Sequence, residues 1–293
     1  MAPPSPAQLA RERLGYYGYY VHGLKPARHH WQRISELMNE SRKRLLIICP
    51  PGHAKSTWIS QIWPCWYIGR HPEQNVAIVS NTSSQAELFL GVVKDTIEMN
   101  PRYREVFPHA VPNHGRGWSS SELFVARSDL TNKDPTLFAT GVGGPLIGKR
   151  LHLAIVDDPL DEENTATENQ RNRVNTWYRR TLMSRLLPEG RVVVILTRWH
   201  EADLAAKLMA SGMYYVVHMK AIDDGGNALW PEMWPIEKLM EAKRELGANG
   251  EPRQGAALVS HCASGSRMID EPTDPQEMLI PRLRCLSTAS RNG

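Results

Sequence analysis

The sequence predicts an α/β fold in which a mainly parallel central sheet is flanked by helices. Short apolar runs of strand length, rich in β-branched residues, alternate along the chain with segments of helical spacing. Most of these runs are apolar throughout, which is typical of parallel strands covered on both faces. A length of 293 residues and a hydrophobic share of 41% are enough for a sizeable core.

Seven segments have the length and composition of strands: Leu45–Cys49, Val76–Ser80, Leu123–Ala126, Leu137–Thr140, Leu153–Val156, Val192–Thr197 and Tyr214–Met219. Four segments between them have helical spacing: Thr57–Ile68, Ser84–Met99, Thr167–Leu187 and Ala202–Met209. Ligands of such sheets bind beyond the carboxyl ends of the strands. Polar residues that directly follow a strand are therefore the first candidates for a site.

Composition narrows the classes of function. No apolar run approaches the roughly 18 residues of a membrane span, so no membrane partner is expected. The four cysteines are scattered without a C-x-x-C pair, which argues against a zinc site or a disulfide framework. The net charge of +4 permits a polyanionic partner without requiring one.

We divide the chain into an N-terminal tail (1–14), a folded body (15–246) and a C-terminal tail (247–293). The C-terminal tail differs from the rest in composition, because all 22 aromatic residues of the chain lie at or before Trp234. It is rich in Ser, Gly, Pro and Arg without sustained periodicity, so we expect it to be mostly disordered.

The first motif follows the strand at Leu45–Cys49 and reads C-P-P-G-H-A-K-S-T. An apolar strand, a tight Pro/Gly turn, Lys-Ser-Thr and a helical pattern form the layout of a phosphate-binding loop. In such a loop a lysine reaches the β- and γ-phosphates and a hydroxyl holds Mg²⁺. The general pattern has glycine where this chain has Cys49 and Ala54. The candidate nucleotide-binding residues here are Pro51, Gly52, His53, Ala54, Lys55, Ser56 and Thr57.

A second motif is the pair Asp157 and Asp158 at the tip of an apolar strand. Asp157 is a candidate Mg²⁺ ligand, and Asp158 is a candidate base that orients or deprotonates a water. The alternative is that D-D-P simply begins a loop. The magnesium interpretation is favoured because the pair follows a phosphate loop of the matching type by about 100 residues.

A third motif, T-R-W-H-E-A-D-L, follows the strand at Val192–Thr197. Thr197 and Arg198 emerge at the same edge as the first two motifs, where they could sense the γ-phosphate. Glu201 and Asp203 also suit the start of a helix. Both interpretations can hold.

These three elements, in this order and spacing, resemble the ATPase half of the large terminase subunit, the DNA-packaging motor of tailed bacteriophages and prophages. The resemblance extends over about Arg28 to Gly247 and includes H-H-W-Q, G-G-P-L-I-G-K-R and A-L-W-P-E-M-W-P. It implies a P-loop NTPase of the additional-strand, RecA-like class. It also implies ATP and Mg²⁺ as cofactors.

Site roles follow from the resemblance position by position. Lys55 would contact the β- and γ-phosphates, Ser56 and Asp157 would hold Mg²⁺, and Thr197 would couple hydrolysis to movement. Asp158 stands where many such motors have a glutamate, with Glu162 or Glu163 as alternatives for the base. Gln32 resembles a glutamine that hydrogen-bonds adenine; the alternative is a solvated helix residue.

The glycine-rich turn before the paired aspartates carries Lys149 and Arg150. The resemblance implies that one of them stabilises the transferring phosphoryl group of a neighbouring subunit. The alternative is a solvated basic pair. On the segment Thr167–Leu187, the arginines spread over several helix faces, so a single DNA-tracking stripe is not predicted.

The resemblance also implies partners and a place of action. The partners would be double-stranded DNA, further copies of the chain in a ring, a portal protein and a small terminase subunit. The place of action would be the host bacterial cytoplasm, at the procapsid portal. The family's nuclease half has no counterpart in the residues after Gly247, so we expect no endonuclease activity from this chain. The competing functions are a helicase-like DNA-dependent ATPase and an inactive remnant that only binds.

Overall fold

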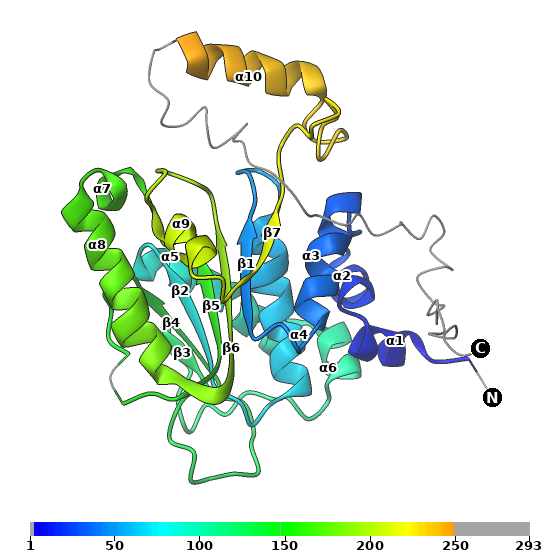
Figure 1. Ribbon diagram of the computed structural model, residues 1–293. Coiled ribbons are helices and arrows are strands. Elements are labelled where there is room, and N and C mark those ends of the chain that lie inside the picture. Colours follow the sequence, from blue (N-terminus) through cyan, green and yellow to red (C-terminus); the bar gives the residue numbers. More distant parts are fainter. Residues whose placement is uncertain (1–2, 147, 249–293) are drawn as a thin grey trace, which may run out of the picture.

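A seven-stranded sheet lies between two layers of helices in the computed structural model, which describes residues 3–146 and 148–248 (Figure 1). The strand order is β3-β4-β2-β5-β6-β1-β7. All neighbouring strands pair in parallel except β3 and β4, which are antiparallel. The predicted α/β fold with a mainly parallel sheet is confirmed.

The strands are β1 (Arg44–Ile48), β2 (Val76–Ser80), β3 (Glu122–Leu123), β4 (Leu137–Gly141), β5 (Leu151–Asp157), β6 (Leu186–Leu196) and β7 (Tyr215–His218). The α-helices are α1 (Pro6–Glu12), α2 (Leu14–His22), α3 (Arg28–Met38), α4 (Trp63–Arg70), α5 (Ser83–Met99), α6 (Pro101–Val106), α7 (Glu162–Thr165), α8 (Glu168–Trp177), α9 (Leu204–Ala210) and α10 (Ile236–Ala248). Two π-helical segments, η1 (Thr57–Ile62) and η2 (Tyr178–Leu182), and a 3₁₀ turn, η3 (Met183–Arg185), continue neighbouring helices.

Each buried strand divides its side chains between two cores, because successive residues point to opposite faces of a sheet. In β1, Leu45 and Ile47 join a core formed with α1–α6, whereas Leu46 and Ile48 join a core formed with α8, η2 and α9. The same alternation runs through β2, β5 and β6. Burial on both faces explains why these strands are apolar throughout.

The N-terminal residues belong to the first of these cores. Residues 6–12, expected to lie in a tail, form α1, whose Leu9 and Ala10 are buried. The Trp66 indole N–H donates to the Ala10 carbonyl over 3.0 Å. The expected C-terminal tail lies, from residue 249 onward, outside the described residues.

Predicted and observed boundaries differ most at two places. Leu186 and Leu187, predicted to end a helix, begin β6, because that strand extends far enough for Leu186 to pair with Leu151. The strand predicted at Leu123–Ala126 is reduced to Glu122–Leu123, and Val125 makes only an isolated bridge with Pro112.

The parallel register brings the ends of the central strands to one edge. Ile48 of β1 pairs with Leu196 of β6, and Asp157 of β5 pairs with both Ile195 and Ser80. Helix α10 lies beyond this edge, above β1 and β7 in the view of Figure 1. Within the described part of the chain, no helix combines the length and apolar character that a bilayer crossing requires.

Candidate active site

The loop between β1 and η1 has the backbone of a phosphate-binding turn. Gly52 and Ala54 both adopt left-handed conformations, with φ of +74° and +52°. The Cys49 N–H donates to the Leu196 carbonyl over 3.2 Å, which ties the start of the loop to β6. Ala54 therefore holds, with an L side chain, a conformation that favours glycine.

Lys55 is the centre of a polar cluster at the end of this loop. Its side chain is only 7% exposed; Nζ lies 2.8 Å from Asp158 Oδ2 and donates to Thr197 Oγ1 over 2.6 Å. Three strands therefore deliver the cluster, since Lys55 follows β1, Asp158 follows β5 and Thr197 follows β6. The convergence of these three predicted residues results directly from the parallel sheet.

Asp157 lies beside two hydroxyl groups. Ser56 Oγ donates to its Oδ1 over 3.1 Å, and Ser60 Oγ donates to its Oδ2 over 2.5 Å. Burial, together with the adjacent charge of Asp158, raises the pKa of Asp157 to about 7. A buried carboxylate of this kind favours a bound cation, which would compensate its charge.

The residues present fit Mg²⁺. Ser56 and Asp157 offer oxygen ligands, which this ion prefers, and it typically takes only one or two carboxylates alongside substrate phosphates. In keeping with so sparse a donor set, no cluster of three or more His, Cys, Asp or Glu suited to a metal occurs in residues 3–146 and 148–248.

Asp158 is held in a fixed orientation. Its backbone is left-handed, with φ of +42°, and its N–H donates to the Ile195 carbonyl over 2.9 Å. The Thr197 N–H donates to its Oδ1 over 2.9 Å. One carboxylate oxygen is therefore fixed by the backbone of β6's end, and the other faces Lys55.

Arg33 of α3 supports the loop from behind, a contact that the sequence did not reveal. It is fully buried, and it donates to the His53 carbonyl over 2.8 Å and to Cys49 Sγ over 3.6 Å. Burial lowers the pKa of the Arg33 guanidinium. Among the described residues, no carboxylate forms an ion pair with it. The only signal was its position, one residue after Gln32.

Two histidines of α3, His29 and His30, lie beside the same carbonyl. His29 Nε2 lies 3.4 Å from the His53 carbonyl oxygen, and the rings of His29 and His30 are 4.0 Å apart. Burial, with the neighbouring His30 and Arg33, lowers the pKa of His29 to about 2, and burial beside Arg33 lowers that of His30 to about 3. These imidazoles are therefore neutral packing groups at neutral pH.

A late segment covers the other side of the loop. The Trp234 indole N–H donates to the Gly52 carbonyl over 3.0 Å, and its ring stacks on His53 with centroids 6.2 Å apart. A Cβ at position 52 would lie 2.7 Å from the Trp234 ring. Gly52 is thus required by its φ and by this contact, and the W-P-E-M-W-P segment packs on the loop.

Arg198 leaves the cluster. Its Nε lies 3.0 Å from Oδ2 of Asp203, which is fully buried and accepts from the Ala206 N–H at the start of α9. The Arg198 Nη2 donates to the carbonyls of His200 and Glu201. The T-R-W-H-E-A-D-L motif therefore contributes Thr197 to the site and uses Arg198 and Asp203 to build the turn into α9.

Three other candidates make no hydrogen bond or ion pair with Lys55 in the described part of the chain. Gln32 is half-buried on α3, and its carbonyl accepts from the Ser35 hydroxyl. Lys149 and Arg150 precede β5, whereas Asp157 ends it, so seven residues, or about 20 Å of strand, separate them from the cluster. Lys149 lies over the Phe138 ring, 4.6 Å from its centroid, and Arg150 is exposed.

Comparison with known proteins places this site in a recognisable context. No family model matches the chain. The large terminase subunit of Enterobacteria phage T3 is 26% identical over 251 residues, which cover 85% of this chain and 39% of that protein. The chain thus spans about two fifths of the length of this curated relative.

Two solved structures share the fold. The large terminase ATPase domain of Thermus phage P74-26, in a point-mutant form, has a TM-score of 0.56 at 16% identity and covers 84% of this chain and 98% of that one. The HK97 bacteriophage large terminase has a TM-score of 0.50 at 15% identity and covers 85% and 55%. The chain therefore has the P-loop NTPase fold and is similar to the ATPase domain of phage large terminases.

Proposed function

We propose that this chain is the ATP-hydrolysing motor domain of a phage large terminase, which drives viral DNA into procapsids. The observation that carries the proposal is the meeting of Lys55, Asp158 and Thr197 beside Ser56 and Asp157 at one sheet edge. The terminase relative and the shared fold support the choice of DNA packaging among the functions of such sites.

Lys55 acts as the phosphate sensor of this site. In the structure it is paired with Asp158 and Thr197. The γ-phosphate of ATP would take over the lysine, because three phosphate oxygens compete for its ammonium. Asp158 Oδ2 then becomes free to orient the attacking water and accept its proton, while Oδ1 stays bound to the Thr197 N–H.

The other residues complete the reaction. Ser56 and Asp157 would hold Mg²⁺, which, when bound, neutralises charge that develops on the transferring phosphoryl group. Gln32 contributes to adenine selection. Thr197 contacts both Lys55 and Asp158. A change in the contacts of Lys55 with the γ-phosphate would therefore alter the contacts at the end of β6.

Lys149 and Arg150 act on a neighbouring subunit in this proposal. Their place at the opposite end of β5 separates them from their own phosphate loop. Arg150 is the better candidate, since it is exposed whereas Lys149 packs on Phe138. Mixing Arg150→Ala subunits with Lys55→Ala subunits should restore part of the ATPase activity if Arg150 acts on a neighbouring subunit. No activity should return if Arg150 acts within its own chain.

In the same proposal the motor works as a ring around double-stranded DNA. It acts at the procapsid portal in the host bacterial cytoplasm, together with a small terminase subunit and the portal protein. The similarity of the chain to the large terminase subunit of phage T3 supports this assignment.

The test is phosphate release from ATP with Mg²⁺, with and without duplex DNA and portal. We expect hydrolysis that Lys55→Ala abolishes and that Lys43→Ala, a half-exposed lysine beyond the other end of β1, leaves intact. Stimulation by DNA and portal supports the packaging motor. Duplex unwinding would point to a helicase instead, and absence of hydrolysis in the unmodified chain would refute the motor.

A further inference from the structure

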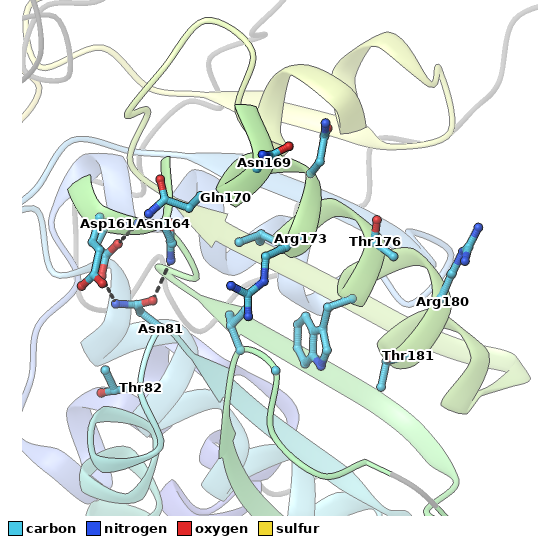
Figure 2. A pocket seen from close by; sticks show the side chains of 16 residues that line it. Asn81, Thr82, Asp161, Asn164, Asn169, Gln170, Arg173, Thr176, Arg180 and Thr181 are labelled. Atoms are coloured by element: carbon cyan, nitrogen blue, oxygen red, sulfur yellow. Dashed lines mark hydrogen bonds between the residues drawn. The ribbon is translucent and has the colours of Figure 1, made fainter. Parts of the chain in front are cut away.

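A second site lies at the same sheet edge, on the far side of β5 from the phosphate loop. It is a groove of about 1150 Å³ between the ends of β2 and β4 and the helices α7, α8 and η2 (Figure 2). Asn81 and Thr82, which follow β2, form one wall together with Val142 and Gly143, which follow β4. The polar face of α8 forms the other wall.

The lining of the groove is mostly polar, and its charged side chains are Arg173, Arg180, Asp161 and Glu163. Eight of its sixteen lining residues carry an amide or a hydroxyl group. Arg173 points into the groove from α8 (Figure 2), is exposed, and has no ion pair or hydrogen bond with another described residue. The indole N–H of Trp177, another lining residue, is buried without a partner in the described part of the chain.

The opposite wall adds a positive end. Thr82 is the N-cap of α5, a helix of 17 residues with no acidic side chain in its first turn, so its dipole is not offset there. Gly143, left-handed with φ of +83°, has open space where a Cβ would stand, so a bulky backbone can approach the wall closely. Guanidinium, amides, hydroxyls and a helix N-terminus are the groups that proteins use on nucleic-acid phosphates and sugars.

The groove is also connected to the catalytic loop. Asn81 donates to Asp161, and Asn164 donates to Asn81 Oδ1 over 2.8 Å (Figure 2). Asn164 also donates to the carbonyl of Pro159, the residue after Asp158, over 3.1 Å. A ligand that moves Asn81 therefore acts on the loop that positions Asp158.

We infer that this groove holds the sugar–phosphate backbone of duplex DNA, with Arg173 as its main phosphate contact. The inference rests on the proposed motor function and adds the place where the motor contacts the DNA. A backbone contact of this kind does not read base sequence, as a motor that moves along any sequence requires. The cluster of Asn81, Asp161 and Asn164 links this grip to hydrolysis.

The test compares Arg173→Ala with Arg179→Ala, an exposed arginine on the same helical segment that does not line the groove. Binding of a duplex of random sequence is measured over a series of salt concentrations, next to basal and DNA-stimulated ATPase. Arg173→Ala should weaken binding and reduce the slope of log K against log salt by about 0.9, the value of one lost phosphate contact. Arg173→Lys should keep the slope.

The outcomes separate this inference from the motor proposal. If Arg173→Ala binds DNA like Arg179→Ala while the unmodified chain shows DNA-stimulated hydrolysis, the groove is not the DNA site and the motor proposal stands. A change in self-association with unchanged DNA binding would assign the groove to a neighbouring subunit and overturn the inference. If the unmodified chain binds no duplex, both fail.

Discussion

The phosphate loop and the groove share one edge of the sheet, yet they treat charge in opposite ways. At the phosphate loop Lys55 is buried and already paired with Asp158 and Thr197. In the groove Arg173 is exposed and has no partner among the described residues. A ligand at the first site must displace contacts that the protein makes with itself, whereas a ligand at the second only adds contacts. The first arrangement suits a site that exchanges its contacts when a ligand binds. The second suits a site that only holds its ligand.

The largest effect at the phosphate-loop site is expected from Asp157→Asn. Loss of the charge that is proposed to hold Mg²⁺ should reduce ATP hydrolysis by roughly a hundredfold or more, as removal of one electrostatic stabiliser does elsewhere. Stability should not fall, because the substitution removes a buried charge that lies beside a second carboxylate. Phosphate release and urea unfolding in metal-free buffer measure both effects. A variant that hydrolyses ATP normally would remove Asp157 from the site.

Arg33→Met probes how the loop is held in shape. The hydrogen bond from the guanidinium to the His53 carbonyl would be lost, which should weaken ATP binding about tenfold. The unfolding midpoint should change little, since an unpaired buried cation is replaced by an apolar chain of similar length. Titration calorimetry with an ATP analogue provides the measurement, and Arg42→Met is the surface control. Unchanged affinity would show that the loop needs no support from α3.

The histidines behind the loop predict a dependence of stability on pH. Their pKa values of about 2 and about 3 in the folded chain lie below the ordinary value of 6.5. The unfolded chain therefore binds more protons below pH 6.5, and stability present above pH 6.5 is lost as the pH falls. The loss at pH 5 is about 2 kcal/mol for each imidazole.

Urea unfolding at pH 7.5 and pH 5.0 measures this loss. His29→Asn should remove one imidazole's share, while His114→Asn, at a side chain 59% exposed, serves as the control. An equal pH dependence in the unmodified chain and in His29→Asn would mean that this imidazole is not held neutral.

Glu163→Gln tests the proposed DNA contact in the groove by removing a negative charge, whereas Arg173→Ala removes a positive one. Glu163 lines the groove and is exposed, so its carboxylate repels a phosphate backbone. Removal of this charge should raise DNA affinity up to about threefold, in line with exposed charge interactions of well under 1 kcal/mol. Glu189→Gln, at the start of β6, should leave affinity unchanged. Weaker DNA binding by Glu163→Gln would contradict a DNA backbone in the groove.

Ala54→Gly should have the smallest effect. A left-handed alanine costs about 1 kcal/mol, so glycine should be neutral or slightly stabilising here. Ala206→Gly, within α9, should instead destabilise by up to about 1 kcal/mol. Thermal unfolding of both variants reveals the contrast. Marked destabilisation by Ala54→Gly would show that the methyl group packs in the loop more than its backbone strains it.

The core of the site could be predicted because it depends on strand ends. Asp157 and Thr197 end or directly follow an apolar run, and a parallel sheet brings such positions together. Lys55 lies at the end of the loop that follows a third such run, where the loop motif places it. The same logic places Lys149 and Arg150 at the opposite edge, because they precede β5 rather than follow it. Strand direction was available in the sequence and suffices to separate the two groups.

The supporting contacts could not be predicted in this way. Arg33 and Trp234 reach the loop from a helix and from a late segment whose positions depend on tertiary packing. Ser60 is an intermediate case, because it lies one helical turn after Ser56 and so shares its direction toward Asp157. Arg198 turned toward Asp203 because a buried carboxylate at the start of α9 needs a cation nearby.

The hydrogen bond from Trp234 to Gly52 couples the docking of the W-P-E-M-W-P segment to nucleotide binding at the phosphate loop. If ATP binding changes the carbonyl of Gly52 or the ring of His53, it changes the free energy with which Trp234 docks. By reciprocity, whatever pulls Trp234 away alters ATP affinity by the same factor. α10 begins two residues after Trp234. A force applied to that helix would therefore change nucleotide affinity at the phosphate loop.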